Sequence, residues 1–329
     1  MHFLILGGTG FVGRHLVERA IAAGHRVTLF NRGHTNPGLF AEVEEVHGDR
    51  DGGLDPLSGR TFDRVMDLSG YVPRIVRESA ELLQEATDHY TFISSVSVYA
   101  DFTSTGIGED SPVATTPDES VEDITRDTYG PLKALCEDVV RSVYKERCTI
   151  VRPGIVAGPF DDTDRLTYWC VRASKGGDFV APDDGGRPVQ FIDARDLAGF
   201  TLKASEDSLH SVFNATGPLK GVLSWGDFLE VCVEVAASDS RPVWVPERVL
   251  READVNLGRE LPLYAPLDHP GFATVDSERA IAAGLEFSPL NRTIDDTLRW
   301  AQEEDQELAA GMTKGREEEI LEALRRSRL

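Results

Sequence analysis

The stretch GGTGFVG, residues 7–13, decides the fold that we predict for this chain. It directly follows the apolar run FLIL (residues 3–6), and apolar residues recur behind it at helical spacing. A glycine-rich turn between a strand and a helix is where a dinucleotide pyrophosphate rests on a helix N-terminus. Gly7 would permit the tight turn, Gly10 the close approach to the pyrophosphate, and Gly13 the packing of helix on strand. The spacing is GxxGxxG, and a glycine-rich turn without a ligand is the alternative.

Short β-branched runs alternate with helical patterns through the first 155 residues. Such alternation is typical of βαβ units and hence of a parallel sheet. We therefore predict an α/β fold with a Rossmann-type, doubly wound parallel sheet. The expected strands are FLIL (3–6), RVTLF (26–30), EEVHG (44–48), FDRVMDL (62–68), YTFISS (90–95) and TIVRPG (149–154).

The regular alternation of strand-like and helical patterns ends after residue 158, where irregular acidic stretches and shorter helical patterns begin. We expect residues 1–158 to form the NAD(P)-binding Rossmann domain. Residues 159–188 and 216–329 would form a smaller, mixed α+β substrate-binding domain with C-terminal helices. The stretch VQFIDARDLAGF predicts a strand followed by a helix, so the chain is expected to return to the first domain around residues 189–215.

Two patterns near the end of the sequence predict helices. Thr293 and Asp296 are spaced as in a capping box, which would start a helix running through Trp300. Further on, Ile320, Leu321 and Leu324 share one side of an amphipathic stretch, which favours a helix packed on its own domain over one that binds a partner.

Composition narrows the class of protein. Asp and Glu outnumber Lys and Arg by 56 to 34, and the net charge of -22 repels phosphate backbones and anionic membrane surfaces. Neither a nucleic acid nor a membrane is therefore an expected partner. The four cysteines form no CxxC pair, so no metal site or disulfide framework is predicted, and a reducing cytoplasm is the expected location. The N-terminus begins with a strand-like apolar segment, so no signal peptide is expected, and no apolar run approaches the roughly 18 residues of a spanning helix.

The end of the second predicted strand indicates which dinucleotide binds. NAD sites usually carry an acid there for the ribose 2′-hydroxyl, but this chain has Asn31 followed by Arg32. A guanidinium suits a 2′-phosphate, so NADP is the expected cofactor and NAD the alternative; a surface role for Arg32 would leave the choice open. Asp49, after the third strand, could accept a hydrogen bond from the adenine amino group or simply form a turn.

Tyr129 and Lys133 stand four residues apart in YGPLK, so they share one face of a helix. A YxxxK pattern arises by chance often enough that it indicates a catalytic pair only when neighbouring sequence motifs support it. Upstream, Ser94 and Ser95 lie at the carboxyl end of a predicted strand, where open α/β sheets bind their ligands. Nearer the N-terminus, Tyr71 and Arg74 follow the fourth strand and are assigned to the start of a helix, while Tyr168 and Trp169, later in the chain, are assigned to a core.

At this point the sequence resembles the extended or atypical branch of the short-chain dehydrogenase/reductase superfamily, with the NAD-dependent epimerase/dehydratase-like fold. The resemblance covers nearly the whole chain. It rests on GGTGFVG (7–13), DLSG (67–70), ISSVSVY (93–99), YGPLK (129–133), RPGIVAGP (152–159) and FIDARDLA (191–198).

The resemblance implies roles for individual residues. Tyr129 would be the general acid/base, Lys133 would lower its pKa and hold the nicotinamide ribose, and Ser95 would hydrogen-bond the reacting oxygen. Ser95 is chosen over its serine neighbours because it lies four residues before Tyr99, the tyrosine of the family's VY pair. The implied cofactor-binding residues are Gly7, Thr9, Gly10, Phe11, Val12, Asn31, Arg32, Asp49, Leu68, Ser69, Gly70, Ser94, Tyr129, Lys133, Pro153 and Ile155.

The physical logic of this set is independent of the resemblance. A free phenol has a pKa of about 10, so it needs a nearby cation and a hydrogen-bond donor before it exchanges protons near neutral pH. The nicotinamide carries out the hydride chemistry, while the protein supplies the proton and the orientation.

Three departures from the family pattern reduce the number of reactions that this chain is expected to catalyse. Val96, Ser97 and Val98 follow Ser95 where sugar-nucleotide dehydratases carry acids, so elimination of water is disfavoured. Val189 stands where sugar-nucleotide enzymes usually grip the diphosphate with an arginine, although Arg187 and Gln190 lie nearby and could substitute. Asn31 followed by Arg32 favours NADPH, which suits net reduction better than epimerisation with bound NAD.

We therefore expect an NADP-dependent oxidoreductase acting on a carbonyl or secondary alcohol of a small molecule, with sugar-like substrates among the candidates. An NAD-dependent nucleotide-sugar epimerase is the first alternative. The second is a non-redox nucleotide- or RNA-binding protein, because VTLFNRG (27–33), YGPLK and PVQFIDARDLA (188–198) resemble atypical members that include a chloroplast RNA-binding group. The net charge and the intact Ser-Tyr-Lys set disfavour it. A homodimer is left open.

Overall fold

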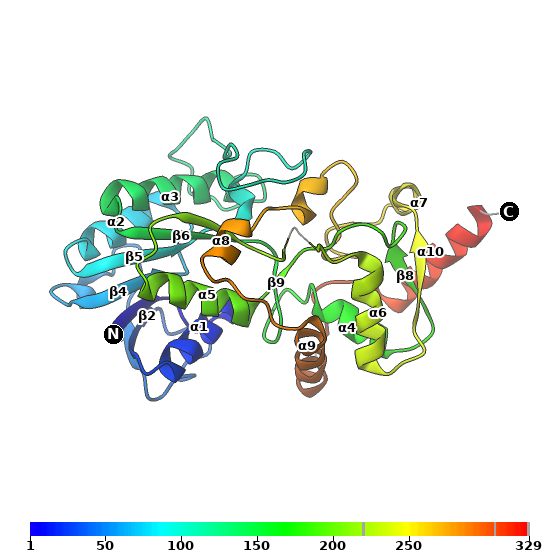
Figure 1. Ribbon diagram of the computed structural model, residues 1–329, viewed down its shortest axis with the longest axis horizontal. Helices are drawn as coiled ribbons and strands as arrows, with labels where there is room; N and C mark the ends of the chain where they lie inside the picture. The colour runs from blue at the N-terminus through cyan, green and yellow to red at the C-terminus, as the bar shows by residue number, and fades with distance from the viewer. Residues whose placement is uncertain (219–220, 306, 328–329) are drawn as a thin grey trace.

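The central sheet dominates the architecture (Figure 1). The structure is a computed structural model that describes residues 1–218, 221–305 and 307–327. Seven strands lie in the order β10-β6-β5-β4-β1-β2-β3, and every neighbouring pair is parallel. The strands are β1 (His2–Leu6), β2 (Arg26–Asn31), β3 (Glu44–His47), β4 (Phe62–Asp67), β5 (Thr87–Ile93), β6 (Cys148–Pro153) and β10 (Val212–Ala215). The predicted doubly wound sheet is confirmed.

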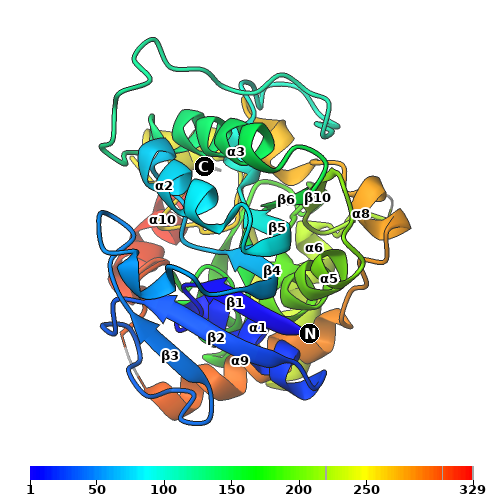
Figure 2. The same ribbon diagram turned by 90° about the vertical axis from the view of Figure 1, so that its left-hand side faces the viewer.

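Helices cover both faces of this sheet, because side chains alternate between its faces and both faces are apolar. Phe3 and Ile5 pack with α1 (Phe11–Ala22) and α5 (Ala194–Glu206). Leu4 and Leu6 belong to the opposite core, with α2 (Pro73–Leu83) and α3 (Tyr129–Tyr144). Figure 2 shows the two pairs of helices on opposite sides of the strands.

A second packed region lies beyond one end of the sheet (Figure 1). Its core holds Tyr168, Trp169, Trp225, Ile320 and Leu324, which confirms the core roles predicted for Tyr168, Trp169 and the amphipathic C-terminal helix. The domain boundaries stay a prediction. The remaining strands and α-helices are β7 (Val156–Ala157), β8 (Asp178–Pro182), β9 (Ile192–Asp193), β11 (Arg241–Val245), α4 (Thr167–Ser174), α6 (Trp225–Ala236), α7 (Glu247–Glu252), α8 (Glu278–Ala282), α9 (Leu290–Glu304) and α10 (Lys314–Ser327), and the short 3-10 turns are η1 (Asp55–Leu57), η2 (Val96–Val98) and η3 (Pro270–Ala273).

The strand and helix predicted around residues 189–200 are present as β9 and α5. β9 pairs with β7 in a two-stranded sheet of its own, whereas β10 returns to the edge of the central sheet beside β6. A third, two-stranded parallel sheet joins β8 to β11.

The predicted start of the last-but-one helix is wrong. α9 begins at Leu290, three residues before Thr293, and no side chain caps it. The Thr293 hydroxyl is buried inside the helix and donates to the Asp193 carboxylate at 2.7 Å. The Thr293 hydroxyl, which the sequence pattern predicted to cap the helix, therefore forms a tertiary hydrogen bond instead.

The four cysteines are buried and free. Within residues 1–218, 221–305 and 307–327, no helix is long and apolar enough to cross a membrane, and no group of His, Cys, Asp or Glu has the arrangement of a metal site.

Candidate active site

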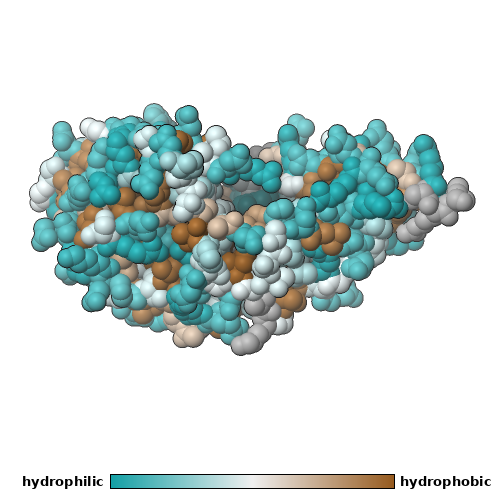
Figure 3. Space-filling view, turned by 90° about the horizontal axis from the view of Figure 1, so that it is seen from above, coloured by the Kyte–Doolittle hydropathy of each residue, from teal (hydrophilic) through white to brown (hydrophobic). Residues whose placement is uncertain are grey.

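A cavity of about 620 Å³ runs along the carboxyl ends of the central strands. This is the edge at which open α/β sheets bind ligands, and the cavity crosses the β1–β4 switch point of the strand order. Figure 3 shows that the surface between the sheet and the second region is hollowed. Its lining brings together fourteen predicted site residues: Gly7, Thr9, Gly10, Phe11, Val12, Asn31, Arg32, Asp49, Leu68, Ser69, Ser94, Tyr129, Lys133 and Pro153.

The glycine-rich turn opens α1 at one end of this cavity. Gly7 has φ +106°, a conformation that other residues rarely adopt, and a Cβ on Gly10 would meet nothing within 4 Å. A Cβ on Gly13 would lie 2.7 Å from Gly8 Cα, so helix and turn are in backbone contact. No side chain caps the helix, which leaves its first N–H groups and its positive dipole end facing the cavity. These features suit an anion such as a pyrophosphate.

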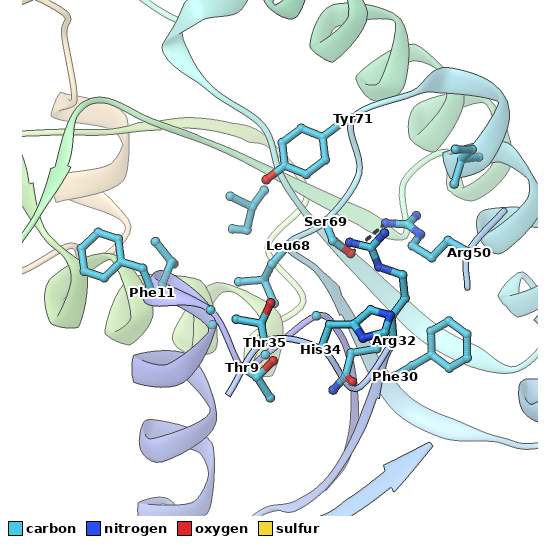
Figure 4. Close-up of a pocket in the computed structure, with 18 of the residues that line it drawn as sticks. Thr9, Phe11, Phe30, Arg32, His34, Thr35, Arg50, Leu68, Ser69 and Tyr71 are labelled. Carbon is cyan, nitrogen blue, oxygen red and sulfur yellow. Dashed lines mark hydrogen bonds between the residues drawn. The ribbon is translucent and has the colours of Figure 1, made fainter. Parts of the chain in front are cut away.

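The loop after β2 places the positively charged side chain of Arg32 beside the cavity (Figure 4). Arg32 is exposed and lines the cavity, and no described residue forms a hydrogen bond or ion pair with it. The Asn31 side chain is already engaged: its amide donates to Glu45 of β3 at 2.7 Å, and its oxygen accepts the Gly33 N–H at 2.6 Å. The sequence analysis missed His34 and Thr35, which line the same stretch of the cavity.

A buried ion pair fixes the floor of the cavity at the end of β4. Arg50 donates to both carboxylate oxygens of Asp67, at 2.6 and 2.9 Å, and to the Ser69 hydroxyl at 3.3 Å. The Tyr90 hydroxyl donates to the same carboxylate at 2.7 Å. Asp49, next to Arg50, lines the cavity but also accepts the Asp51 N–H at 3.0 Å, so it forms a turn as well.

Tyr129 is the first residue of α3 and lines the cavity. Burial raises the pKa of its phenol, and the nearby Ser95 side chain acts in the opposite direction. Ser95 caps the short turn η2 by accepting the Ser97 N–H at 3.1 Å, which fixes its hydroxyl just past the end of β5. At neutral pH the phenol is therefore protonated, next to a positioned hydroxyl.

Lys133 lies one turn along α3 and is almost completely buried. Its ammonium donates to the carbonyls of Gly70, at 2.7 Å, and Ile93, at 2.6 Å, so it joins the ends of β4 and β5. Burial lowers its pKa to about 8. No described carboxylate forms an ion pair with it, and none of its hydrogen bonds reaches Tyr129. The ammonium faces two carbonyls in this arrangement. The lowering of the Tyr129 pKa by Lys133 stays a prediction.

Two residues near Tyr129 were not predicted for the site. Tyr71 is 42% exposed, lines the cavity, and its ring centre is 6.4 Å from that of Tyr129. Its hydroxyl points into the cavity (Figure 4), and α2 begins only at Pro73, so the helix-start role expected for Tyr71 is wrong. Gly130 touches the Ser95 turn, because a Cβ there would lie 2.2 Å from the Ser97 carbonyl oxygen.

Three predicted residues lie outside the lining. The Ser95 hydroxyl accepts the Ser97 N–H just past the end of β5, and the Gly70 carbonyl accepts from Lys133. Ile155 packs against the core of the second region, and its carbonyl accepts the Ile192 N–H at 2.9 Å.

The two side chains considered for a diphosphate grip are already engaged. Gln190 donates to the Gly217 and Val275 carbonyls, at 2.6 and 2.8 Å, and accepts the Val275 N–H at 3.0 Å. Arg187 donates to the Ala265 carbonyl at 3.0 Å. Val189 is buried.

Comparison with known proteins places these features in context. The sequence model of the NAD dependent epimerase/dehydratase family matches residues 3–68 and 69–215. The chain is 27% identical over 232 residues to the chloroplast stem-loop binding protein of 41 kDa b of Arabidopsis thaliana, a match covering 65% of this chain. That match spans 58% of the plant protein's length.

Two solved structures share the fold at low identity. The UDP-glucuronic acid 4-epimerase of Bacillus cereus, in complex with NAD, is 16% identical with a TM-score of 0.64 and covers 92% of this chain and 99% of its own. The human epimerase family protein SDR39U1, with NADPH, is 20% identical with a TM-score of 0.60 and covers 91% and 99%. Their bound cofactors differ, so the shared fold accommodates either nicotinamide dinucleotide.

Proposed function

Because the chain belongs to the NAD dependent epimerase/dehydratase family, and is thus an NAD(P)-dependent enzyme of the extended short-chain dehydrogenase/reductase type, we propose that it is an NADP-dependent oxidoreductase. It acts on a carbonyl or secondary alcohol of a small molecule, with sugar-like molecules among the candidates. The observation that carries this proposal is the protonated, half-buried Tyr129 phenol near Ser95, in a cavity that begins at an uncapped helix. A protonated phenol is the form that reduction of a carbonyl requires.

The lining fits a dinucleotide. The open space at Gly10 and the free N–H groups of α1 suit a pyrophosphate, and Leu68 and Ser69 would border the adenosine. At the other end, Pro153 would border the nicotinamide. That ring, when bound, supplies the hydride chemistry.

The chain's own residues handle the proton. Tyr129 donates its phenolic proton to the carbonyl oxygen as that oxygen gains negative charge, and the Ser95 hydroxyl hydrogen-bonds the same oxygen. The Lys133 ammonium, fixed by two carbonyls, is a positive charge one turn away that favours the phenolate left behind. Holding the nicotinamide ribose is the second role proposed for Lys133.

Replacing Arg32 by Ala should weaken NADPH binding by about 2 kcal/mol, or roughly 30-fold, while changing NADH binding little. The reason is that Arg32 has no partner among the described residues, and the 2′-phosphate is the group by which NADPH differs from NADH. Calorimetric titration of both variants with both dinucleotides measures the two affinities. An equal loss for the two cofactors would rule out recognition of the 2′-phosphate by Arg32.

The rate of carbonyl reduction should fall as the pH rises through about 8, the pKa to which burial lowers Lys133. Below this pH Lys133 is charged and favours the phenolate. Above it Lys133 loses its charge. The Tyr129 phenol stays protonated through this range, because its pKa is raised above its usual value. The profile of kcat from about pH 6 to about pH 10 at saturating NADPH tests this. A flat profile through pH 8 would contradict the role of the charge.

An NAD-dependent nucleotide-sugar epimerase is the second candidate, favoured by the fold shared with the Bacillus cereus enzyme. It predicts NAD that copurifies and does not exchange, which the ultraviolet spectrum of the purified protein would detect. The engaged side chains of Arg187 and Gln190 disfavour a diphosphate grip. RNA binding, which the name of the plant relative suggests, is disfavoured by the net charge of -22. A homodimer and a cytoplasmic location stay predictions.

A further inference from the structure

A long segment without helix or strand connects the Ser95 turn to Tyr129. Residues 100–128 arch over α2 and α3 (Figure 2), and a loop of this length is uncommon in a compact protein. Its first half is anchored by bridges between Tyr99 and Val113 and between Ile107 and Val275. Its second half, residues 115–127, is called the strap below.

The strap is exposed and forms part of the cavity wall. Ile124 is 53% exposed and lines the cavity. The strap leads directly into α3, because the Thr125 carbonyl accepts the Tyr129 N–H at 3.0 Å. Its position therefore shapes the cavity beside Tyr129.

One side chain supplies the polar anchor of the strap. Arg74, at the start of α2, donates to both carboxylate oxygens of Glu122, at 2.7 and 3.1 Å. Among the described residues, these are the hydrogen bonds that join the strap to any part of the chain before residue 115 or beyond Tyr129. The same guanidinium donates to Asp51, at 2.8 and 3.2 Å, and to Glu78 at 2.9 Å.

The contacts of Arg74 span the cavity mouth. Asp51 follows Asp49 and Arg50, which line the cavity from the loop after β3, and Tyr71 and Val72 line it just before Arg74. One guanidinium thus ties the loop after β3, the start of α2 and the strap together around one end of the cavity.

We propose that Arg74 is a positioning residue that holds the strap over the cavity and thereby slows the release of the bound dinucleotide. The proposal rests on the cofactor role proposed above. Because the Arg74–Glu122 ion pair is exposed to solvent, it holds the strap only weakly. The strap therefore opens to let the cofactor exchange and then closes again. Salt screens exposed ion pairs, so cofactor residence depends on ionic strength.

The cofactor-dependent test is the dissociation rate of NADPH, followed by its fluorescence after mixing the complex with excess NADP. Arg74→Ala and, from the strap side, Glu122→Gln should each speed dissociation about five-fold. Arg77→Ala is the matched control, because Arg77 is an exposed arginine of the same helix that pairs with Glu81 and forms no hydrogen bond or ion pair with the described residues of the strap. High salt should bring the wild-type rate close to that of Arg74→Ala. Equal dissociation rates in wild type and both variants would overturn the proposal.

The second test needs no cofactor. Arg126 is the one Lys or Arg in the strap, so trypsin cleavage after it reports how far the strap opens. Arg74→Ala and Glu122→Gln should be cleaved there several-fold faster than wild type and than Arg77→Ala. Unchanged cleavage would overturn the anchoring role. Faster cleavage in a protein that binds no nicotinamide dinucleotide would uphold the anchor and refute the proposed function, so the two failures are distinguishable.

Discussion

Replacing Tyr129 by Phe should lower kcat for carbonyl reduction roughly 10³-fold, which is within the usual contribution of a general acid. The ring and its packing against Tyr71 are kept, and only the phenolic hydroxyl near Ser95 is lost. NADPH affinity should change less than about three-fold, since Phe keeps the cavity shape. Single-turnover rates with saturating NADPH, together with calorimetric affinities, separate the two effects.

A control variant shows whether a lower rate in Tyr129→Phe comes merely from a loss of structure. Tyr99→Phe removes a buried hydroxyl that bonds Asn214, at 2.6 Å, and belongs to a network behind the site. It should cost stability rather than the chemical step. If Tyr129→Phe kept the wild-type rate, the phenol would not be the proton donor and the proposed mechanism would fail.

Replacing Gly130 by Ala is expected to have the second largest effect, on both stability and rate. The added methyl group would lie 2.2 Å from the Ser97 carbonyl oxygen, so the start of α3 must move away from the Ser95 turn. Overpacking of this kind costs about 2 kcal/mol, more than the helix propensity that Ala gains. Because Tyr129 and Ser95 would separate, kcat should fall on the order of 10²-fold.

Gly315→Ala is a matched control for this experiment. Gly315 is also the second residue of a helix, α10, and a Cβ there would meet nothing within 4 Å. This variant should be as stable as wild type or slightly more stable. Urea unfolding and kcat of both variants test the pair, and equal behaviour would show that contact between Gly130 and Ser97 does not set the geometry of the site.

The sequence predicts the central sheet well because most of its strands are buried on both faces. Such strands are largely apolar runs, and the six predicted runs overlap β1 to β6. The edge strand β3 is the exception, since none of its residues is buried. The phosphate loop is equally predictable, since its glycines, strand and helix are adjacent in the chain. β10 is the seventh strand, and only its approximate region was predicted because its pairing with β6 is set by distant residues.

The candidate site was predicted in part, and the misses share a cause. Arg50 and Gly130 matter through partners brought close only by the fold, Asp67 and Ser97. Tyr71 is part of the site because α2 begins two residues later, a boundary that local pattern does not fix. The signal that could have identified Arg50 was a charged residue at a strand end, next to the chosen Asp49.

The order in which the chain completes its central sheet has a consequence for its biosynthesis. β10 pairs with β6 but is translated only after residues 154–211, and α5, which covers Phe3 and Ile5, is also made late. A nascent chain that has reached only residue 158 therefore has an unpaired parallel edge and an uncovered apolar face. Both features attract chaperones and promote aggregation, so translation slowed in this interval should lower the yield of folded protein.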